Sequence, residues 1–128
     1  MIYLFTMNKT YIHALVSTSA LAILHFFASD GHWYVRYPGF DILMHILGGL
    51  ALAFSIFWII KTFLPKYEPN FWSLIVLTLA LGFAWEAMET MYDIAGAPVG
   101  TTKYYWDSAK DLVNDMLGAI IAAFLLKK

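Results

Sequence analysis

Long apolar runs separated by short polar connections dominate this chain. Each run ends where glycine, proline or charged residues gather. A helix that crosses the hydrocarbon core of a bilayer needs about 20 mainly apolar residues. The pattern therefore predicts an all-α polytopic membrane protein, a four-transmembrane-helix bundle with helices over about residues 10–28, 41–62, 71–93 and 106–126.

The length of 128 residues accommodates these helices and their connections and leaves no room for a second domain. We therefore expect a single transmembrane domain over residues 1–128. A signal peptide is the competing interpretation of the first run, because Lys9 precedes an apolar stretch that ends in small residues. The run is long for a signal peptide and lacks a clean small-x-small cleavage site, which favours a membrane helix.

Composition changes the picture in two ways. Hydrophobic residues make up 61% of the chain and charged residues 13%, about half the charged share of a soluble domain, so lipid is the expected neighbour of most of the surface. The net charge of −1 and the lack of a basic stripe give no indication of nucleic-acid binding. With no cysteine, disulfides, thiolate nucleophiles and Cys-ligated metals are excluded, and His, Asp and Glu remain as possible metal ligands.

Lysine and arginine are divided unevenly between the two sides of the predicted bundle. One side, with the N-terminus, the 61–70 turn and the C-terminus, holds Lys9, Lys61, Lys66, Lys127 and Lys128. The other side holds Arg36, Lys103 and Lys110. Cytoplasmic connections carry an excess of these residues, so we expect both termini to lie in the cytoplasm.

Acidic residues and a histidine gather in one half of the predicted bundle. An aspartate at the centre of a membrane helix costs about 2.5–3.5 kcal/mol on insertion scales. The members are Asp41 and His45 at the start of the second helix, Glu86 and Glu89 at the end of the third, and Asp107, Asp111 and Asp115 at the start of the fourth. Because successive helices run in opposite directions, all of them fall on the same side, together with His25 near the end of the first helix.

Spacing places the members of each group on one helix face. The pair in the second helix is four residues apart and the pair in the third is three apart, which is one helical turn. The aspartates of the fourth helix follow one another at intervals of four, a stripe roughly 12 Å long. One turn further on lie the small residues Gly48, Gly49 and Gly118. They permit the second and fourth helices to approach closely beneath the stripes.

Such a cluster suits four kinds of role. Carboxylates with one imidazole favour a divalent metal such as Mg, Mn, Ca or Fe, and neighbouring buried carboxylates also suit acid/base chemistry. A proton or cation relay is a third role and a structural role, holding helices together, is a fourth. The predicted metal ligands are Asp41, His45, Glu86, Glu89, Asp111 and Asp115, and the predicted catalytic residues are Glu86, Asp115 and His45. The apolar opposite half argues against a continuous transport path.

Each of these residues also has a simpler interpretation. Asp41 and Asp107 suit helix N-caps, and Asp111 suits an ion pair with Lys110 or Lys103, or a position facing water. Glu89 suits the head-group region. Asp115, His45 and Glu86 are harder to explain in this way, because they lie inside or against apolar segments.

Three motifs resemble a known group of small membrane proteins. The segment FDILMHILGGLALAF (40–54) resembles the D-x-x-x-H-x-x-x-G segment of the VanZ-like and YjdF-like families. WEAMET (85–90) is similar to their paired-acid segment, and YYWDSAKDLVNDMLGA (104–119) to their D-x-x-x-D/N-x-x-x-D-x-x-G-A segment. The chain departs from the YjdF-like pattern at Thr90, where that family has Trp, and at Tyr105, where it has Gly.

The resemblance covers roughly residues 40–119 and leaves the first helix unmatched. It implies a prokaryotic cytoplasmic (inner) membrane protein without an established activity. VanZ-like proteins are associated with resistance to a glycopeptide antibiotic that acts on cell-wall precursors, an association that need not extend here. The residues that match the family motifs are Asp41, His45, Glu86, Glu89, Asp107, Asp111 and Asp115.

Three hypotheses about function follow. The first is a metal or acid/base site that opens to the extracytoplasmic face and acts on a lipid head group or lipid-linked substrate within the bilayer. The second is a non-enzymatic binding or assembly module whose acids are structural. The third is proton or cation transfer. The sequence leaves the oligomeric state, the substrate and the identity of any metal open.

Overall fold

The structure, a computed structural model, describes residues 2–94 and 96–127, with side chains from residue 9 onward. The described residues form helices and no strands. The helices are α1 (Ile2–Asp30), α2 (Trp33–Arg36), α3 (Phe40–Phe63), α4 (Phe71–Met91) and α5 (Thr102–Leu126). The all-α fold class predicted from the apolar runs is confirmed for this part of the chain.

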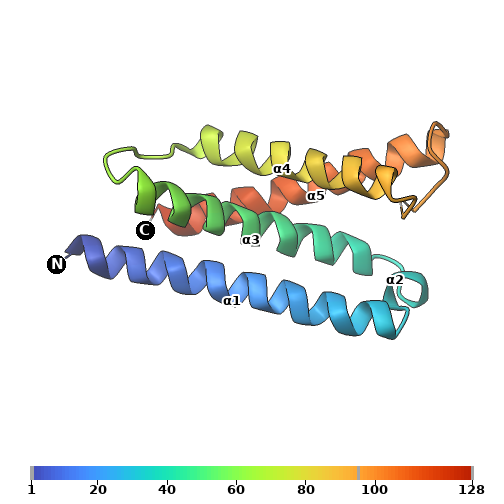
Figure 1. The fold of residues 1–128 in the computed structure, drawn as a ribbon, viewed down its shortest axis with the longest axis horizontal. Coiled ribbons are helices and arrows are strands. Elements are labelled where there is room, and N and C mark those ends of the chain that lie inside the picture. The colour runs from blue at the N-terminus through green and yellow to red at the C-terminus, as the bar shows by residue number, and fades with distance from the viewer. Residues whose placement is uncertain (1, 95, 128) are drawn as a thin grey trace.

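The four long helices lie side by side along the molecule (Figure 1). α3 packs against α1, α4 and α5, and α4 also packs against α5. α3 and α5 run in the same direction, while α1 and α4 run in the opposite one (Figure 1). The short α2 and the α4–α5 connection lie at one end, which we call the α2 end. The connection between α3 and α4 and the end of α5 lie at the other, which we call the terminal end.

Helix boundaries differ from the sequence-based expectation where local caps decide them. α4 ends at Met91 rather than near residue 93, because Asp93 adopts a left-handed φ of 56°. The N–H groups of Asp93 and Ile94 then donate to the carbonyls of Thr90 and Glu89, at 3.3 and 3.0 Å, in a Schellman motif.

α5 corresponds to the fourth helix predicted from the sequence. It begins at Thr102, four residues before the predicted start near residue 106. The Thr101 side chain accepts a hydrogen bond from the N–H of Tyr104 at 3.2 Å and caps the helix. α3 is preceded by Gly39, whose φ of 86° suits glycine. Asp41 and Asp107 are therefore not the N-caps that one sequence interpretation made them.

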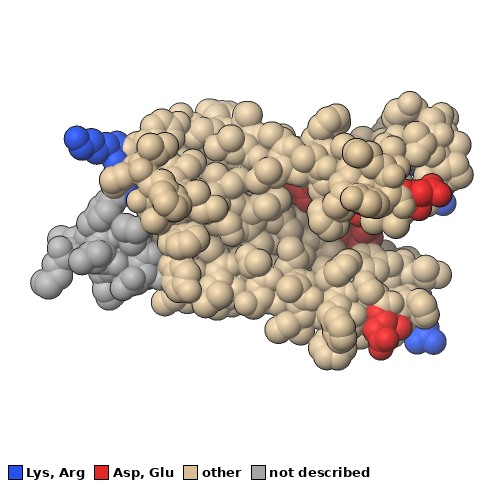
Figure 2. Space-filling model, in the orientation of Figure 1, with Lys and Arg blue, Asp and Glu red and all other residues tan. Residues whose placement is uncertain are grey.

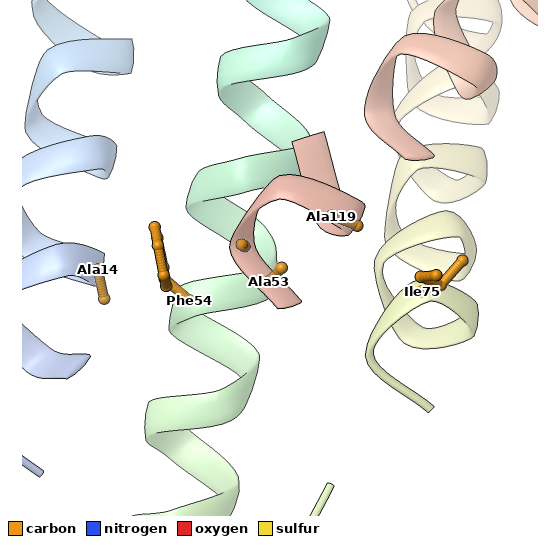
Figure 3. Packing of buried hydrophobic residues seen from close by; sticks show 6 residues of the cluster. Ala14, Ala53, Phe54, Ile75 and Ala119 are labelled. Carbon is orange, nitrogen blue, oxygen red and sulfur yellow. The ribbon is translucent and has the colours of Figure 1, made fainter. Parts of the chain in front are cut away.

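The core at the terminal end consists mostly of alanine and one aromatic ring. Ala14 of α1, Ala53 and Phe54 of α3, Ile75 of α4 and the α5 residues Ala119 and Ala122 form one buried cluster (Figure 3). Small residues let helices approach closely in a bilayer, where packing takes over from the hydrophobic effect as the force between helices. The Phe54 ring also stacks on His13, with ring centroids 5.1 Å apart.

Charged groups at the terminal end lie close to helix ends. Lys61, near the end of α3, is buried, forms an ion pair with Glu68 and donates to the carbonyl of Pro65 at 3.2 Å. The Lys127 ammonium lies over the rings of Phe71 and Phe124. Lys128, expected to close the last helix with it, lies outside the described residues.

The outer surface of the bundle is apolar. Large side chains on all four long helices are exposed, among them Phe26, Trp72, Phe83 and Phe124, each more than half exposed. Three helices in the described residues are long and apolar enough to cross a membrane: Lys9–Asp30, Phe40–Phe63 and Phe71–Met91. α5 is equally long but carries charges through its first half. The exposed apolar surface fits a lipid environment.

Candidate functional site

The imidazole of His45 lies at the centre of the polar half of the bundle, between α3 and α5. Its Nδ1 forms a 3.1 Å hydrogen bond with Oδ1 of Asp115. Because an ionised carboxylate only accepts hydrogen bonds, Nδ1 is the donor, and the lone pair of a neutral ring is on Nε2. The bond therefore sets the tautomer and the orientation of the ring.

The other ring nitrogen faces two carboxylates. Nε2 of His45 lies 3.7 Å from Oδ1 of Asp41 and 3.7 Å from Oδ2 of Asp111. One donor atom from each of these three residues lies within 4.8 Å of the others. Asp111 and His45 are mostly buried, with side chains 7% and 13% exposed, whereas Asp41 is 36% exposed. The group is therefore closed on the inside and open on the Asp41 side.

A lysine borders this group at the α2 end. The ammonium of Lys110 donates to Asp107 at 2.6 Å and lies 3.6 Å from Asp111 and 3.8 Å from Asp41. The ion pair that the sequence suggested for Asp111 is thus present. Lys110 is itself 42% exposed, so it screens the open edge of the cluster rather than its interior.

Glycines bring the three helices together around Asp115. A Cβ on Gly49 of α3 would collide with the backbone of Asp115, and one on Gly118 of α5 would collide with the backbone of α3 at Ile46. The predicted close approach of these two helices is confirmed. On α4, Gly82 lies directly against the carboxylate of Asp115, so α4 also needs a glycine beside the acid.

The two acids of α4 have different surroundings. Glu86 is buried, with 8% of the residue exposed, and its Oε1 has no hydrogen-bond partner in the described residues. It follows Gly82 by one turn, so it lies on the same face of α4 and nearer the α2 end. Glu89 is only partly buried, and its carboxylate accepts a hydrogen bond from the Trp85 indole at 2.9 Å. Neither carboxylate belongs to the group of three around His45 Nε2.

A tyrosine that the sequence analysis did not select lies at the mouth of the cluster. The Tyr34 hydroxyl on α2 shares a 2.8 Å hydrogen bond with Nδ1 of His25. Burial, and then the negative charges of Asp41 and Glu89, raise the pKa of Tyr34 above its ordinary value of 10. Its hydroxyl therefore stays protonated at neutral pH. Its place in a polar connection rich in aromatics gave no sequence signal that separated it from an interfacial anchor.

The cluster reaches the side of the bundle. Figure 2 shows Asp and Glu surface in a hollow between α3 and α4, in the half of the bundle near α2. The acids are thus accessible from the lateral face as well as from the end of the molecule.

The geometry is compatible with a metal centre as well as with a set of ion pairs between the imidazole and the carboxylates. Ligands bound to one ion at about 2.1 Å lie roughly 3.0–3.4 Å apart, so the 3.7 Å separations would close by only a few tenths of an ångström. Two carboxylates and one imidazole suit Mn²⁺, Fe²⁺ or Mg²⁺. A carboxylate on the far nitrogen of a ligating histidine is the usual outer support of such a site, and Asp115 has that position.

Comparison with known proteins places the chain in one family. A search of the curated proteins gave no match, and a search of the solved structures gave none either. A family model described as "Predicted membrane protein (DUF2238)" matches residues 1–128. The match agrees with the apolar helices and the exposed apolar surface. The chain therefore belongs to the DUF2238 family of predicted membrane proteins.

Proposed function

We propose that this protein crosses the membrane four times and binds a divalent metal ion through Asp41, His45 and Asp111. The single observation that carries the proposal is that the two nitrogens of the His45 ring have different partners. Nδ1 is hydrogen-bonded to Asp115, and Nε2 faces two carboxylate oxygens at 3.7 Å. A fourth crossing is supported by the 25 residues of α5, about 37 Å of helix, which run along α3.

The remaining acids have supporting roles in this proposal. Asp115 positions His45, and Glu86 is the acid/base group because it is buried beside the site and lacks a hydrogen-bond partner for Oε1. The substrate is a lipid head group or a lipid-linked precursor, which reaches the site through the lateral hollow. The apolar core at the terminal end favours a site open at one end over a continuous path for protons or cations.

Placement in the cell follows from the sequence. The resemblance to VanZ-like and YjdF-like proteins and the uneven distribution of lysine support the cytoplasmic membrane of a prokaryote, with both termini inside. The metal site then opens to the extracytoplasmic face.

A structural role is the second candidate, and Lys110 favours it. Its ammonium lies within 4 Å of Asp41, Asp107 and Asp111. A lysine in that position already supplies positive charge to the cluster, so the acids and Lys110 would stabilise the α3–α5 contact without any ion.

Manganese binding separates the two candidates. Protein purified in detergent and stripped with a chelator is titrated with Mn²⁺, and free Mn²⁺ is followed by electron paramagnetic resonance. We expect one ion per chain in the wild type and at least a hundredfold weaker binding in His45→Ala. The matched control is His13→Ala, which removes an exposed histidine in the apolar half.

The outcomes are distinct for the two candidates. Loss of binding in His45→Ala alone supports the metal site. Equal Mn²⁺ binding by the wild type and His45→Ala, or no binding by either, contradicts the metal site and leaves the structural role.

A further inference from the structure

Two buried carboxylate oxygens in the polar half lack the donors that a carboxylate needs. Oε1 of Glu86 and Oδ1 of Asp111 have no hydrogen-bond partner in the described residues, although the residues are only 8% and 5% exposed. The nearest cation to Asp111 Oδ1 is Lys110, at 3.6 Å, which is beyond hydrogen-bond distance. A buried acceptor without a donor costs about 1–3 kcal/mol, and more when charged. These two oxygens need N–H or O–H donors, while Nδ2 of Asn114 on α5 is a buried donor without a partner in the described residues.

These two acids come from α4 and α5, which pack against each other. Gly82 lies against the Asp115 carboxylate, so the antiparallel α4 and α5 are level at that point. One turn toward the α2 end brings Glu86 on α4 level with Asp111 on α5. Both oxygens are buried, whereas the side chain of Asp41 is 36% exposed.

The charge in this region selects a cation. Four carboxylates, those of Asp41, Asp107, Asp111 and Asp115, lie within 4 Å of the Lys110 ammonium or the His45 ring. Glu86 adds a fifth acid, which is buried, in the same half. A divalent ion at His45 would still leave the region negative. A phosphate entering by itself would meet this excess of negative charge, whereas an ammonium group would meet complementary charge and supply three N–H donors.

We propose that the polar half of the bundle binds the primary ammonium group of a membrane-lipid head, which enters from the hollow between α3 and α4 and reaches Glu86 and Asp111 as its acceptors. This assignment rests on the proposed function in one respect, that the substrate is a lipid head group. Lateral entry favours a lipid over a free amine, because the hollow opens on a face whose exposed side chains are apolar. The acyl chains then stay in the bilayer while the head group enters.

A graded series of head groups tests the proposal on the wild-type protein. Phosphatidylethanolamine and its mono-, di- and trimethylated forms carry the same phosphate and acyl chains but have three, two, one and no N–H donors. We measure the affinity of each lipid by native mass spectrometry of the detergent-purified protein. We expect affinity to fall with each methyl group, by at least tenfold over the series. Equal binding across the series, or tighter binding of phosphatidylglycerol, overturns the proposal.

Two variants test which residue is responsible for the preference for a primary amine. Glu86→Gln keeps the shape of the side chain and removes the charge, and should abolish the preference for the primary amine. Asp30→Asn removes an exposed acid at the end of α1 and should retain it. A preference that survives in Glu86→Gln contradicts the assigned acceptor. Ethanolamine alone binding as tightly as the lipid contradicts the lipid as the source.

Metal content, measured in the same samples, keeps this inference separate from the proposed metal site. Bound manganese without any head-group preference contradicts only the ammonium assignment. A head-group preference in protein that binds no manganese contradicts only the metal site.

Discussion

The two halves of the bundle are built by the same helices but filled with different side chains. At the terminal end, Ala53 of α3 and Ala119 and Ala122 of α5 belong to one buried apolar cluster, in which Phe54 faces α1 (Figure 3). At the α2 end, the same two helices meet through His45, Asp111 and Asp115. In both halves small residues let the backbones approach closely. These residues are alanines at the terminal end and glycines at the α2 end.

The difference separates two questions: what holds the helices together, and why the polar half contains acids. Close packing of small residues is sufficient to associate helices in lipid. The polar half adds buried carboxylates, and breaking up such a group typically costs more than the group contributes over a well-packed apolar interface. Adhesion between the helices therefore does not require the acids, which is consistent with the proposed metal site.

The largest expected effect comes from the apolar half. Phe54→Ala removes a ring that is 3% exposed and should lower the free energy of unfolding by about 3–5 kcal/mol. Thermal unfolding in detergent gives the loss of stability, and manganese titration should show an unchanged affinity in the protein that remains folded. A loss of metal with intact stability would mean that the two halves are not independent.

Neighbouring glycines offer a sharper test of the polar half. Gly49→Ala places a methyl group against the Asp115 backbone and should destabilise the protein by about 1–3 kcal/mol. Gly48→Ala is the matched control, because the nearest atom to its Cβ, Oδ1 of Asp115, lies 4.0 Å away. We expect little change in unfolding temperature for the control. Equal destabilisation by both variants would contradict the close contact between α3 and α5.

The smallest expected effect concerns the support of the histidine. Asp115→Asn keeps the side-chain volume but removes the charge that orients the His45 ring. Manganese affinity should fall about 10–100-fold, less than for His45→Ala, because a supporting residue is lost and not a ligand. A complete loss of binding would indicate that Asp115 is itself a ligand. An unchanged affinity would indicate that Asp115 has no role in the site.

Much of the fold was predictable because the apolar runs are long and their breaks are marked. Gly39, Pro65 and Asn70 lie in the connections that bound α3 and α4, and the expected starts of these helices are within one residue of the observed ones. The start of α5 was placed too late, because the first turn reads as a polar loop of lysine and tyrosine. Only the cap formed by Thr101 shows that the helix has already begun.

The site was predictable in part for a similar reason. The interval of four residues between Asp41 and His45, and between Asp111 and Asp115, indicated one face on each helix. The rotation of one helix against another is a tertiary property, so the sequence did not show that His45 lies between Asp111 and Asp115. Nor did it single out Gly82, whose importance depends on the acid packed against it from α5.

The glycine contacts between α3 and α5 also bear on how tightly an ion can be held. Because the backbone of Asp115 touches Gly49, no flexible side chain separates the two helices at this point. His45 and Asp111, one turn away on either helix, are thus mounted at a nearly fixed separation. An ion in the proposed metal site would meet ligands that are already ordered, so little conformational entropy would be lost on binding. In the proposed metal site, the rigid contact would favour ions of one radius over ions of very different radius.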